Sequence, residues 1–161
     1  MPITISRMEN KKQKTGYVEA NLSKDEVVIK KAKLHWFIFA KSAITLFISI
    51  LLYNMDDVSH LGTFALLLSV FFFIEALIKK YTTELAVTNK RIIAKYGLIM
   101  RLTIELNLSK IEGLNVHQGI MGRIFDFGDI IVSGTGGKQS PIRYIENPLE
   151  FRKTVNEQIE D

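Results

Sequence analysis

Two ionisable side chains, Lys41 and Glu75, interrupt otherwise apolar stretches of this 161-residue chain. Lys41 lies five residues after Trp36, where the first stretch begins, and Glu75 lies three residues before Ile78, where the second ends. If the stretches run antiparallel, an ammonium and a carboxylate reach a similar depth, as in a charge pair or in a proton or ion pathway. The alternative is that each side chain extends separately to the nearest polar layer. Because two helices offer few polar positions to line a conduit, we expect a pair or simple extension rather than a pathway.

Four basic side chains form a second candidate group near one predicted strand pair: Lys90, Arg91, Lys95 and Arg101. Cations that converge on a phosphate form strong, charge-assisted hydrogen bonds with it. Lys95 and Arg101 also fit ordinary positions on the solvated face of a strand. The group is therefore a candidate contact for an anionic lipid headgroup or for a partner.

Other residues with catalytic potential lack the necessary spacing. In the glycine-rich segment 133–140, Gln139 follows the lysine where a phosphate-binding loop needs Ser or Thr. The three histidines lie far apart in the sequence, and the chain has no cysteine. Asp126 and Asp129 flank Phe127-Gly128, a pattern more typical of a turn than of acid–base catalysis. We therefore predict no catalytic, cofactor-binding or metal-binding residues and no enzyme activity.

The elements that must position these side chains begin with two apolar segments of 18 residues each, Trp36–Tyr53 and Leu61–Ile78. As helices, each would span roughly 27 Å, close to the ~30 Å hydrocarbon core of a bilayer. Both are apolar on every face, whereas a soluble helix has one apolar stripe. The sequence predicts a transmembrane helical hairpin over residues 36–78.

The charges that flank the hairpin predict its orientation. Lysines precede it in Lys30–Lys33 and follow it at Lys79–Lys80, whereas the loop Asn54–His60 holds acids and no Lys or Arg. Because basic residues mark the cytoplasmic side, both termini are predicted to be cytoplasmic, in a multi-pass protein of the cell (inner) membrane. Residues 1–35 hold eight Lys or Arg against four acids, a basic excess beside the bilayer that favours a lipid surface. No basic stripe is interleaved with aromatics, so nucleic acid is not a predicted partner.

The remainder divides into residues 1–35, a polar and basic segment, and residues 79–161, a small antiparallel domain. Within the first, Tyr17–Lys33 either adds a strand to that domain or leads into the membrane. Asn147 and Pro148 are typical of a helix start, and Leu149, Val155 and Ile159 give that helix an apolar stripe. Alternation and β-branched runs predict strands over Glu84–Thr88, Arg91–Tyr96, Arg101–Leu108, Ile111–His117, Ile130–Ser133 and Ile142–Ile145. The predicted fold class is α+β: a transmembrane hairpin, then an antiparallel sheet or open barrel, then a C-terminal helix.

The order of short motifs resembles that of bacterial pleckstrin-homology-like (PH-like) membrane proteins. The matching stretches are Thr88–Ile92, Tyr96–Ile99, Ile104–Ile111, Gly122–Asp129 and Asn147-Pro148. The resemblance covers roughly residues 82–161 and implies a cytoplasmic, membrane-tethered PH-like barrel in a family with no assigned reaction. The basic spacing of phosphoinositide-binding PH domains is not reproduced.

These observations favour a non-enzymatic, membrane-anchored module that binds a protein partner as a scaffold. One alternative is a sensor of anionic lipid headgroups that uses the four basic residues. Another is an accessory subunit of a membrane transport complex in which Lys41 and Glu75 matter.

Overall fold

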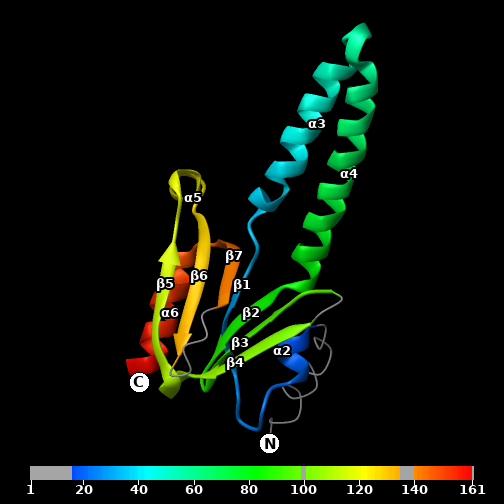
Figure 1. The fold of residues 1–161 in the computed structure, drawn as a ribbon. Helices are drawn as coiled ribbons and strands as arrows, with labels where there is room; N and C mark the ends of the chain where they lie inside the picture. Colours follow the sequence, from blue (N-terminus) through cyan, green and yellow to red (C-terminus); the bar gives the residue numbers. More distant parts are fainter. Residues whose placement is uncertain (1–15, 99–100, 135–139, 161) are drawn as a thin grey trace, which may run out of the picture.

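The computed structural model describes residues 16–98, 101–134 and 140–160, which form a helical hairpin that projects from two antiparallel sheets (Figure 1). The fold class is α+β, as predicted. The short helix α2 (Tyr17–Ala20) lies beside the first sheet, and the long helix α6 (Pro148–Glu160) packs behind the second.

The hairpin consists of the 3-10 turn η2 (Trp36–Phe39), helix α3 (Ala40–Tyr53), the 3-10 turn η3 (Asp56–Val58) and helix α4 (Ser59–Thr82). Helix α4 extends beyond the predicted 61–78 at both ends. Only 17% of the residues in each apolar segment are buried, so neither is a core helix within the described residues. Both segments are long and apolar enough to cross a membrane.

Small residues bring α3 and α4 together. Two serine hydroxyls donate across the helix pair, Ser49 to the carbonyl of Gly62 at 2.8 Å and Ser69 to that of Ser42 at 3.1 Å. A Cβ on Gly62 would come within 2.6 Å of the backbone of Tyr53, so only glycine allows this approach. Small interface residues and serine hydrogen bonds are typical of helix pairs in lipid, where packing replaces the hydrophobic effect.

The first sheet contains strand β1 (Val28–Ala32), β2 (Glu84–Thr88), β3 (Arg91–Tyr96) and β4 (Leu102–Asn107), in that order. Strand β1 pairs antiparallel with β2, with Ala32 opposite Leu85. This decides between the two alternatives for residues 17–33, because the segment adds a strand to the sheet. The hairpin therefore connects two neighbouring strands, and the domain bounds of 1–35, 36–78 and 79–161 remain a prediction.

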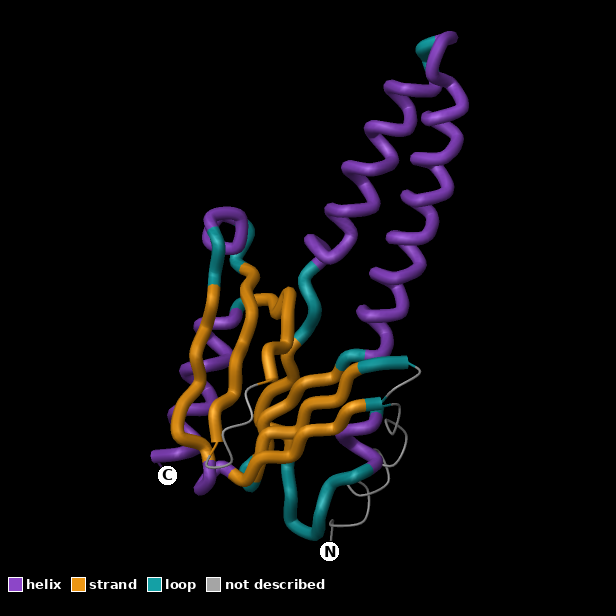
Figure 2. The backbone as a smooth tube through the Cα atoms, in the orientation of Figure 1, coloured by secondary structure: helices purple, strands orange, loops and turns teal. Residues whose placement is uncertain are grey.

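The second sheet contains strand β5 (Ile111–His117), β6 (Phe127–Gly134) and β7 (Ser140–Glu146), and its strands cross those of the first steeply (Figure 2). The turn η4 (Leu108–Lys110) leads from β4 to β5, and helix α5 (Ile120–Ile124) lies between β5 and β6. An isolated bridge between Leu34 and Ile145 links the sheets after β1. In the described part of the chain this bridge is the one pairing between the two sheets, so the barrel that the resemblance implied is not closed.

Apolar side chains of both sheets and of α6 form one core. Phe151 and Val155 of α6 are 1% and 0% exposed, whereas Leu149 and Ile159 are 49% and 39% exposed. The predicted stripe is thus correct only at Val155. Residues 151 and 155 lie one turn apart on the same face, and that face covers the open side between the sheets.

Candidate functional site

Arg91, one of the four predicted basic contacts, is part of a structural ion pair. Its Nε and Nη2 atoms each donate to the carboxylate of Glu26 at 2.9 Å, and Nη1 donates to Glu105 at 2.6 Å. Burial of Glu26 raises its pKa, but hydrogen bonds from Arg91, the backbone of Ser23 and the hydroxyl of Thr88 outweigh burial and lower the pKa to about 2. The same pair raises the pKa of Arg91. The pair fastens the segment before β1 to β3.

The other three basic residues do not join Arg91 around one point. Lys90 donates to the carbonyl of Lys24 at 2.7 Å. Lys95 Nζ lies 3.9 Å from the Glu84 carboxylate and 4.9 Å from the centre of the Tyr17 ring. Arg101 is exposed just before β4, next to residues 99–100 outside the described ranges.

The turn that carries Lys90 and Arg91 also lies away from the hairpin. Strand β2 begins at Glu84, directly after α4, and this turn follows the other end of the strand. A strand of five residues separates the two ends by roughly 15 Å. A headgroup site at these residues would therefore be far from the hairpin.

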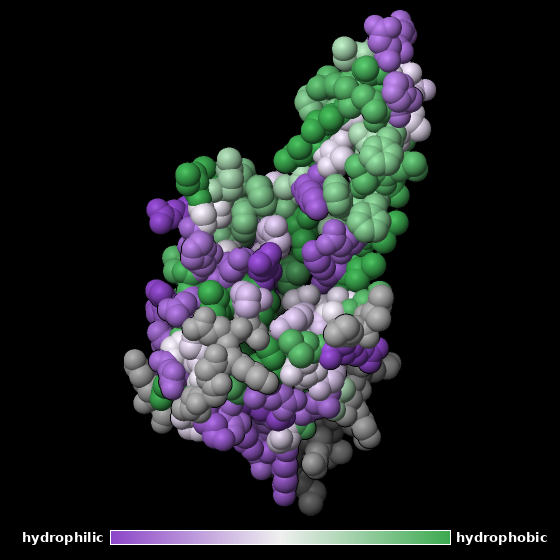
Figure 3. All heavy atoms as spheres, in the orientation of Figure 1, coloured by the Kyte–Doolittle hydropathy of each residue, from purple (hydrophilic) through white to green (hydrophobic). Residues whose placement is uncertain are grey.

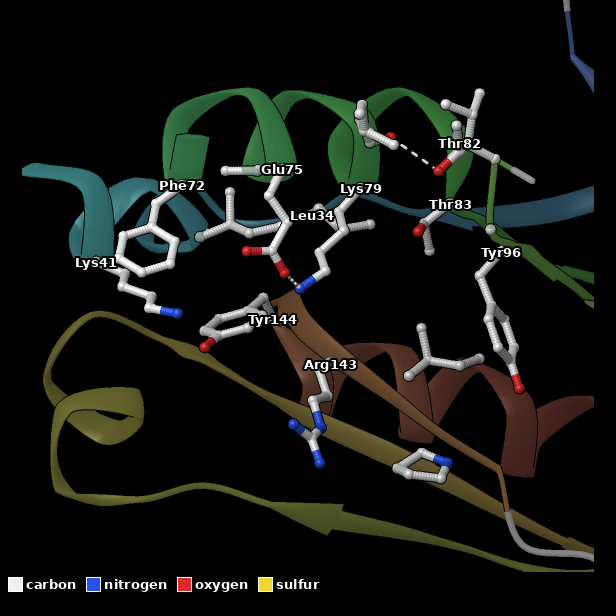
Figure 4. A pocket seen from close by; sticks show the side chains of 17 residues that line it. Leu34, Lys41, Phe72, Glu75, Lys79, Thr82, Thr83, Tyr96, Arg143 and Tyr144 are labelled. Carbon is white, nitrogen blue, oxygen red and sulfur yellow. Dashed lines mark hydrogen bonds and ion pairs between the residues drawn. The ribbon is translucent and has the colours of Figure 1, made fainter. Parts of the chain in front are cut away.

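Lys41 and Glu75, by contrast, line one cavity at the base of the hairpin (Figure 4). Glu75 pairs with Lys79 at 2.5 Å, one turn further along α4. The Lys41 ammonium lies 3.6 Å from the centre of the Phe72 ring, a cation–π contact. Lys41 and Glu75 therefore line the same cavity, but each has a closer contact with another residue. Their coupling remains a prediction.

The cavity has a volume of about 530 Å³ and lies between the hairpin and strand β7. Lys41, Lys79 and Arg143 are the basic residues that line it, and Glu75 is the acidic one. In Figure 4 the Arg143 guanidinium points away from the other three charged groups. Figure 4 shows Lys41 and Lys79 projecting from the hairpin toward Tyr144 of β7. Apolar side chains line much of the remaining wall: Leu34, Ile38, Phe72, Ala76, Ile78, Leu98 and Ile142. The site can hold an anionic group beside an apolar one.

A bulge in β7 forms the far wall of the cavity. Asp129 of β6 lies opposite two residues, Arg143 and Tyr144, because the pairing shifts there. Tyr144 has a φ of 60°, a strained value for a bulky residue, and its N–H donates to the Asp129 carboxylate at 3.2 Å. Its carbonyl accepts from His35 N at 2.7 Å. Bulges re-aim side chains near functional sites, and this one ties β7 to the start of the hairpin.

Sequence reasoning missed Lys79, Arg143 and Tyr144 as site residues. In the sequence, Lys79 indicates only the orientation of the hairpin, and Arg143 and Tyr144 occupy ordinary positions in a predicted strand. Tyr144 lines the cavity because of the bulge in β7, and the spacing of residues within that strand does not indicate a bulge. In the described ranges, no group of three His, Asp or Glu side chains is placed to hold a metal.

Comparisons with known proteins add one match. A family model described as "Bacterial PH domain" matches residues 37–159, which include both the hairpin and most of the sheet region. No curated protein and no solved structure matches the chain significantly. Strand β1 lies before the matched residues, although it pairs within the first sheet.

Proposed function

Because the chain belongs to the bacterial PH domain family, we propose that it is a non-enzymatic interaction module attached to a membrane by its hairpin. Membership suggests a module that binds protein or lipid. Two helices of spanning length and composition, poorly buried and joined by small residues, support the attachment. The proposed orientation is that of the lysine flanks, with both termini in the cytoplasm of a multi-pass protein of the inner membrane.

The ligand we propose is an anionic phospholipid, held by its headgroup in the cavity at the hairpin base. The observation that supports it most is that Lys41, Lys79 and Arg143 all line this cavity beside an apolar wall, where the hairpin meets the sheets. In a membrane-attached chain this junction lies at the headgroup layer. A phosphate there would accept from the cations, and the acyl chains would continue along the hairpin. The lipid-sensor alternative thus gains support, but at residues other than Lys90, Arg91, Lys95 and Arg101.

Lipid retention tests this proposal. Full-length chain, purified in detergent, is exchanged into mixtures of phosphatidylglycerol and phosphatidylcholine and analysed by native mass spectrometry. We expect the parent to retain phosphatidylglycerol preferentially. Lys79→Gln with Arg143→Gln should reduce this preference at least about tenfold, because each charge-assisted hydrogen bond contributes about 1.5 kcal/mol.

A matched control removes the same charges elsewhere. Lys153→Gln with Arg152→Gln changes exposed residues of α6, and it should leave the preference unchanged. Equal retention of both lipids by the parent, or an unchanged preference in the cavity variant, would contradict a headgroup site.

A protein partner, the function that the sequence favoured, has a different observation in its support. Among the described strands, β4 pairs only with β3, so its other edge is open to a partner strand. A groove of about 670 Å³ lies beside it, lined mainly by apolar side chains of both sheets, including Ile104 and Val132. We keep a scaffold role as the second candidate. Thr103→Pro, which removes a donor from the edge strand, should abolish a partner complex in intact cells and leave lipid retention unchanged.

The transport-accessory alternative rests on Lys41 and Glu75 alone. Since both side chains line the same cavity as the proposed headgroup site, they do not mark a separate location.

A further inference from the structure

Helix α5, between β5 and β6, exposes an unusual amount of apolar surface for so short an element. Ile120 is 78% exposed, Met121 54% and Ile124 67%, and the following Phe125 is 41% exposed. A loop tip on a water-facing domain is normally polar. Contiguous exposed apolar side chains of this kind mark an interaction surface.

The loop is held in one conformation rather than left loose. The side-chain amide of Gln118 donates to the carbonyls of Gly122 and Phe127 at 3.2 and 3.1 Å. A Cβ on Gly122 would come within 2.4 Å of the Phe127 carbonyl, so glycine allows α5 to close against β6. Since this anchoring fixes the backbone, the outward direction of the apolar side chains is built into the fold.

Aromatic contacts place α5 beside the start of the hairpin. The ring of Phe125 lies 5.8 Å from that of Trp36 and 5.7 Å from that of Phe37, centre to centre. Trp36 itself is 57% exposed and opens the first apolar segment. Figure 3 shows apolar surface over α5 on the same side as the hairpin, with polar surface predominating on the opposite end of the sheets. The apolar surfaces of α5 and the hairpin therefore meet at one level.

We propose that α5 and Phe125 form a third membrane contact, in addition to helices α3 and α4. They would insert shallowly into the leaflet through which the hairpin enters. This rests on the membrane attachment proposed above, and it is independent of the headgroup site. Arg123, exposed between the apolar residues, would lie among headgroup phosphates. With three contacts instead of two, the sheets are held at a fixed angle to the bilayer, and the cavity at the hairpin base stays at headgroup depth.

A bilayer fits this surface better than a second copy of the chain does. A stable dimer buries roughly 800 Å² per partner, which the few exposed side chains of one five-residue helix and its neighbour do not supply. Insertion in lipid has no such minimum, since each apolar side chain contributes in proportion to its own area. Continuity with Trp36 also matches the interfacial position that tryptophan prefers in membranes.

Spin-label accessibility tests the inference directly, because the chain has no cysteine to remove. The variants Ile120→Cys and Ile124→Cys are labelled and placed in nanodiscs of phosphatidylcholine and phosphatidylglycerol, one copy per disc. Leu67→Cys, on the exposed surface of α4, reports on the hairpin, and Lys153→Cys, exposed further along α6, is the control away from the proposed contact. Relaxation by oxygen, which partitions into lipid, is compared with relaxation by a water-soluble nickel chelate.

We expect labels at 120 and 124 to respond more to oxygen than to nickel, like the label at 67, and the label at 153 to show the reverse. If 67 is in lipid but 120 and 124 behave like 153, the third contact is overturned while the attachment of the hairpin stands. If 67 also responds mainly to nickel, the proposed attachment fails and the inference fails with it. Shielding at 120 and 124 that appears only with two copies per disc would identify a second copy as the occupant and overturn the inference.

Discussion

The carboxylate of Glu26 and the guanidinium of Arg91 form a two-point ion pair, with both nitrogen–oxygen distances at 2.9 Å, although 65 positions separate the two residues in the chain. The Glu26 side chain is fully buried, and the hydroxyl of Thr88 donates to the same carboxylate at 2.8 Å. A buried charge with several hydrogen-bond partners is held in a defined geometry, and the loss of any one partner is strongly destabilising. The pair makes the segment before the hairpin a structural part of the sheet.

The ion pair predicts acid sensitivity. The pKa of Glu26 is about 2 in the fold and near 4.5 without it, so its contribution is complete above pH 4.5 and lost as the pH falls toward 2. That contribution amounts to about 3 kcal/mol of unfolding free energy. Chemical unfolding of the full chain in detergent at a series of pH values measures it. Glu26→Gln should show a much flatter dependence across this window, and an equally steep one would contradict the assignment.

Removing the Arg91 guanidinium should lower the unfolding free energy more than removing the neighbouring Lys90 ammonium does. Arg91→Ala leaves the Glu26 carboxylate buried without its main partner, and we expect it to lower the unfolding free energy by about 3 kcal/mol. Lys90→Ala, in the adjacent exposed position, should change it by less than about 0.5 kcal/mol. Similar effects of the two substitutions would show that Arg91 is an ordinary surface cation.

Lys41 and Glu75 are predicted to be coupled through their shared cavity. In a double-mutant cycle of Lys41→Met and Glu75→Gln, the two single substitutions should together lower the unfolding free energy by about 1 kcal/mol more than the double substitution does. The cycle of Lys79→Met and Glu75→Gln should give a larger value, because that pair is in direct contact at 2.5 Å. Thermal unfolding in detergent provides both measurements. Strict additivity in the first cycle would leave Lys41 and Glu75 as independent side chains.

Several elements were predictable because their signals are local. Strands Arg91–Tyr96 and Ile111–His117 have the predicted bounds, since β-branched runs and alternation specify a pleated element within a few residues. The hairpin followed from apolar composition on every helix face. The helix that begins at Pro148 followed from its cap, although only long-range packing selects Phe151 and Val155 as its buried face.

The remainder depends on contacts that sequence spacing does not show. Strand β1 precedes the hairpin and its partner β2 follows it, so their pairing joins residues that are far apart in the chain. Val27–Ile29 therefore suggested a strand but not which strand it pairs with. Helix α5 has five residues with an internal glycine, too short for a periodic signal. The cavity combines Lys79 with Arg143 and the bulge at Tyr144, residues that only the folded chain brings together.

Orientation has a separate test that needs no ligand. Single cysteines in the loop 54–60 should react with a membrane-impermeant thiol reagent in intact cells, whereas a cysteine at Lys153 should react only after the cells are opened. The reason is that lysines flank the hairpin on the side of the sheets and acids lie in its loop. The opposite pattern would reverse the assignment of both termini to the cytoplasm.

The occupant of the cavity at the hairpin base is the central question, and photo-cross-linking from position 144 answers it most directly. A photoreactive phenylalanine analogue replaces Tyr144 in the full chain in intact cells, with the exposed position 153 on α6 as the control. We predict an adduct whose added mass is that of an anionic phospholipid, at 144 and not at 153. A protein adduct at 144 with no lipid adduct would contradict the headgroup site and favour the scaffold function instead.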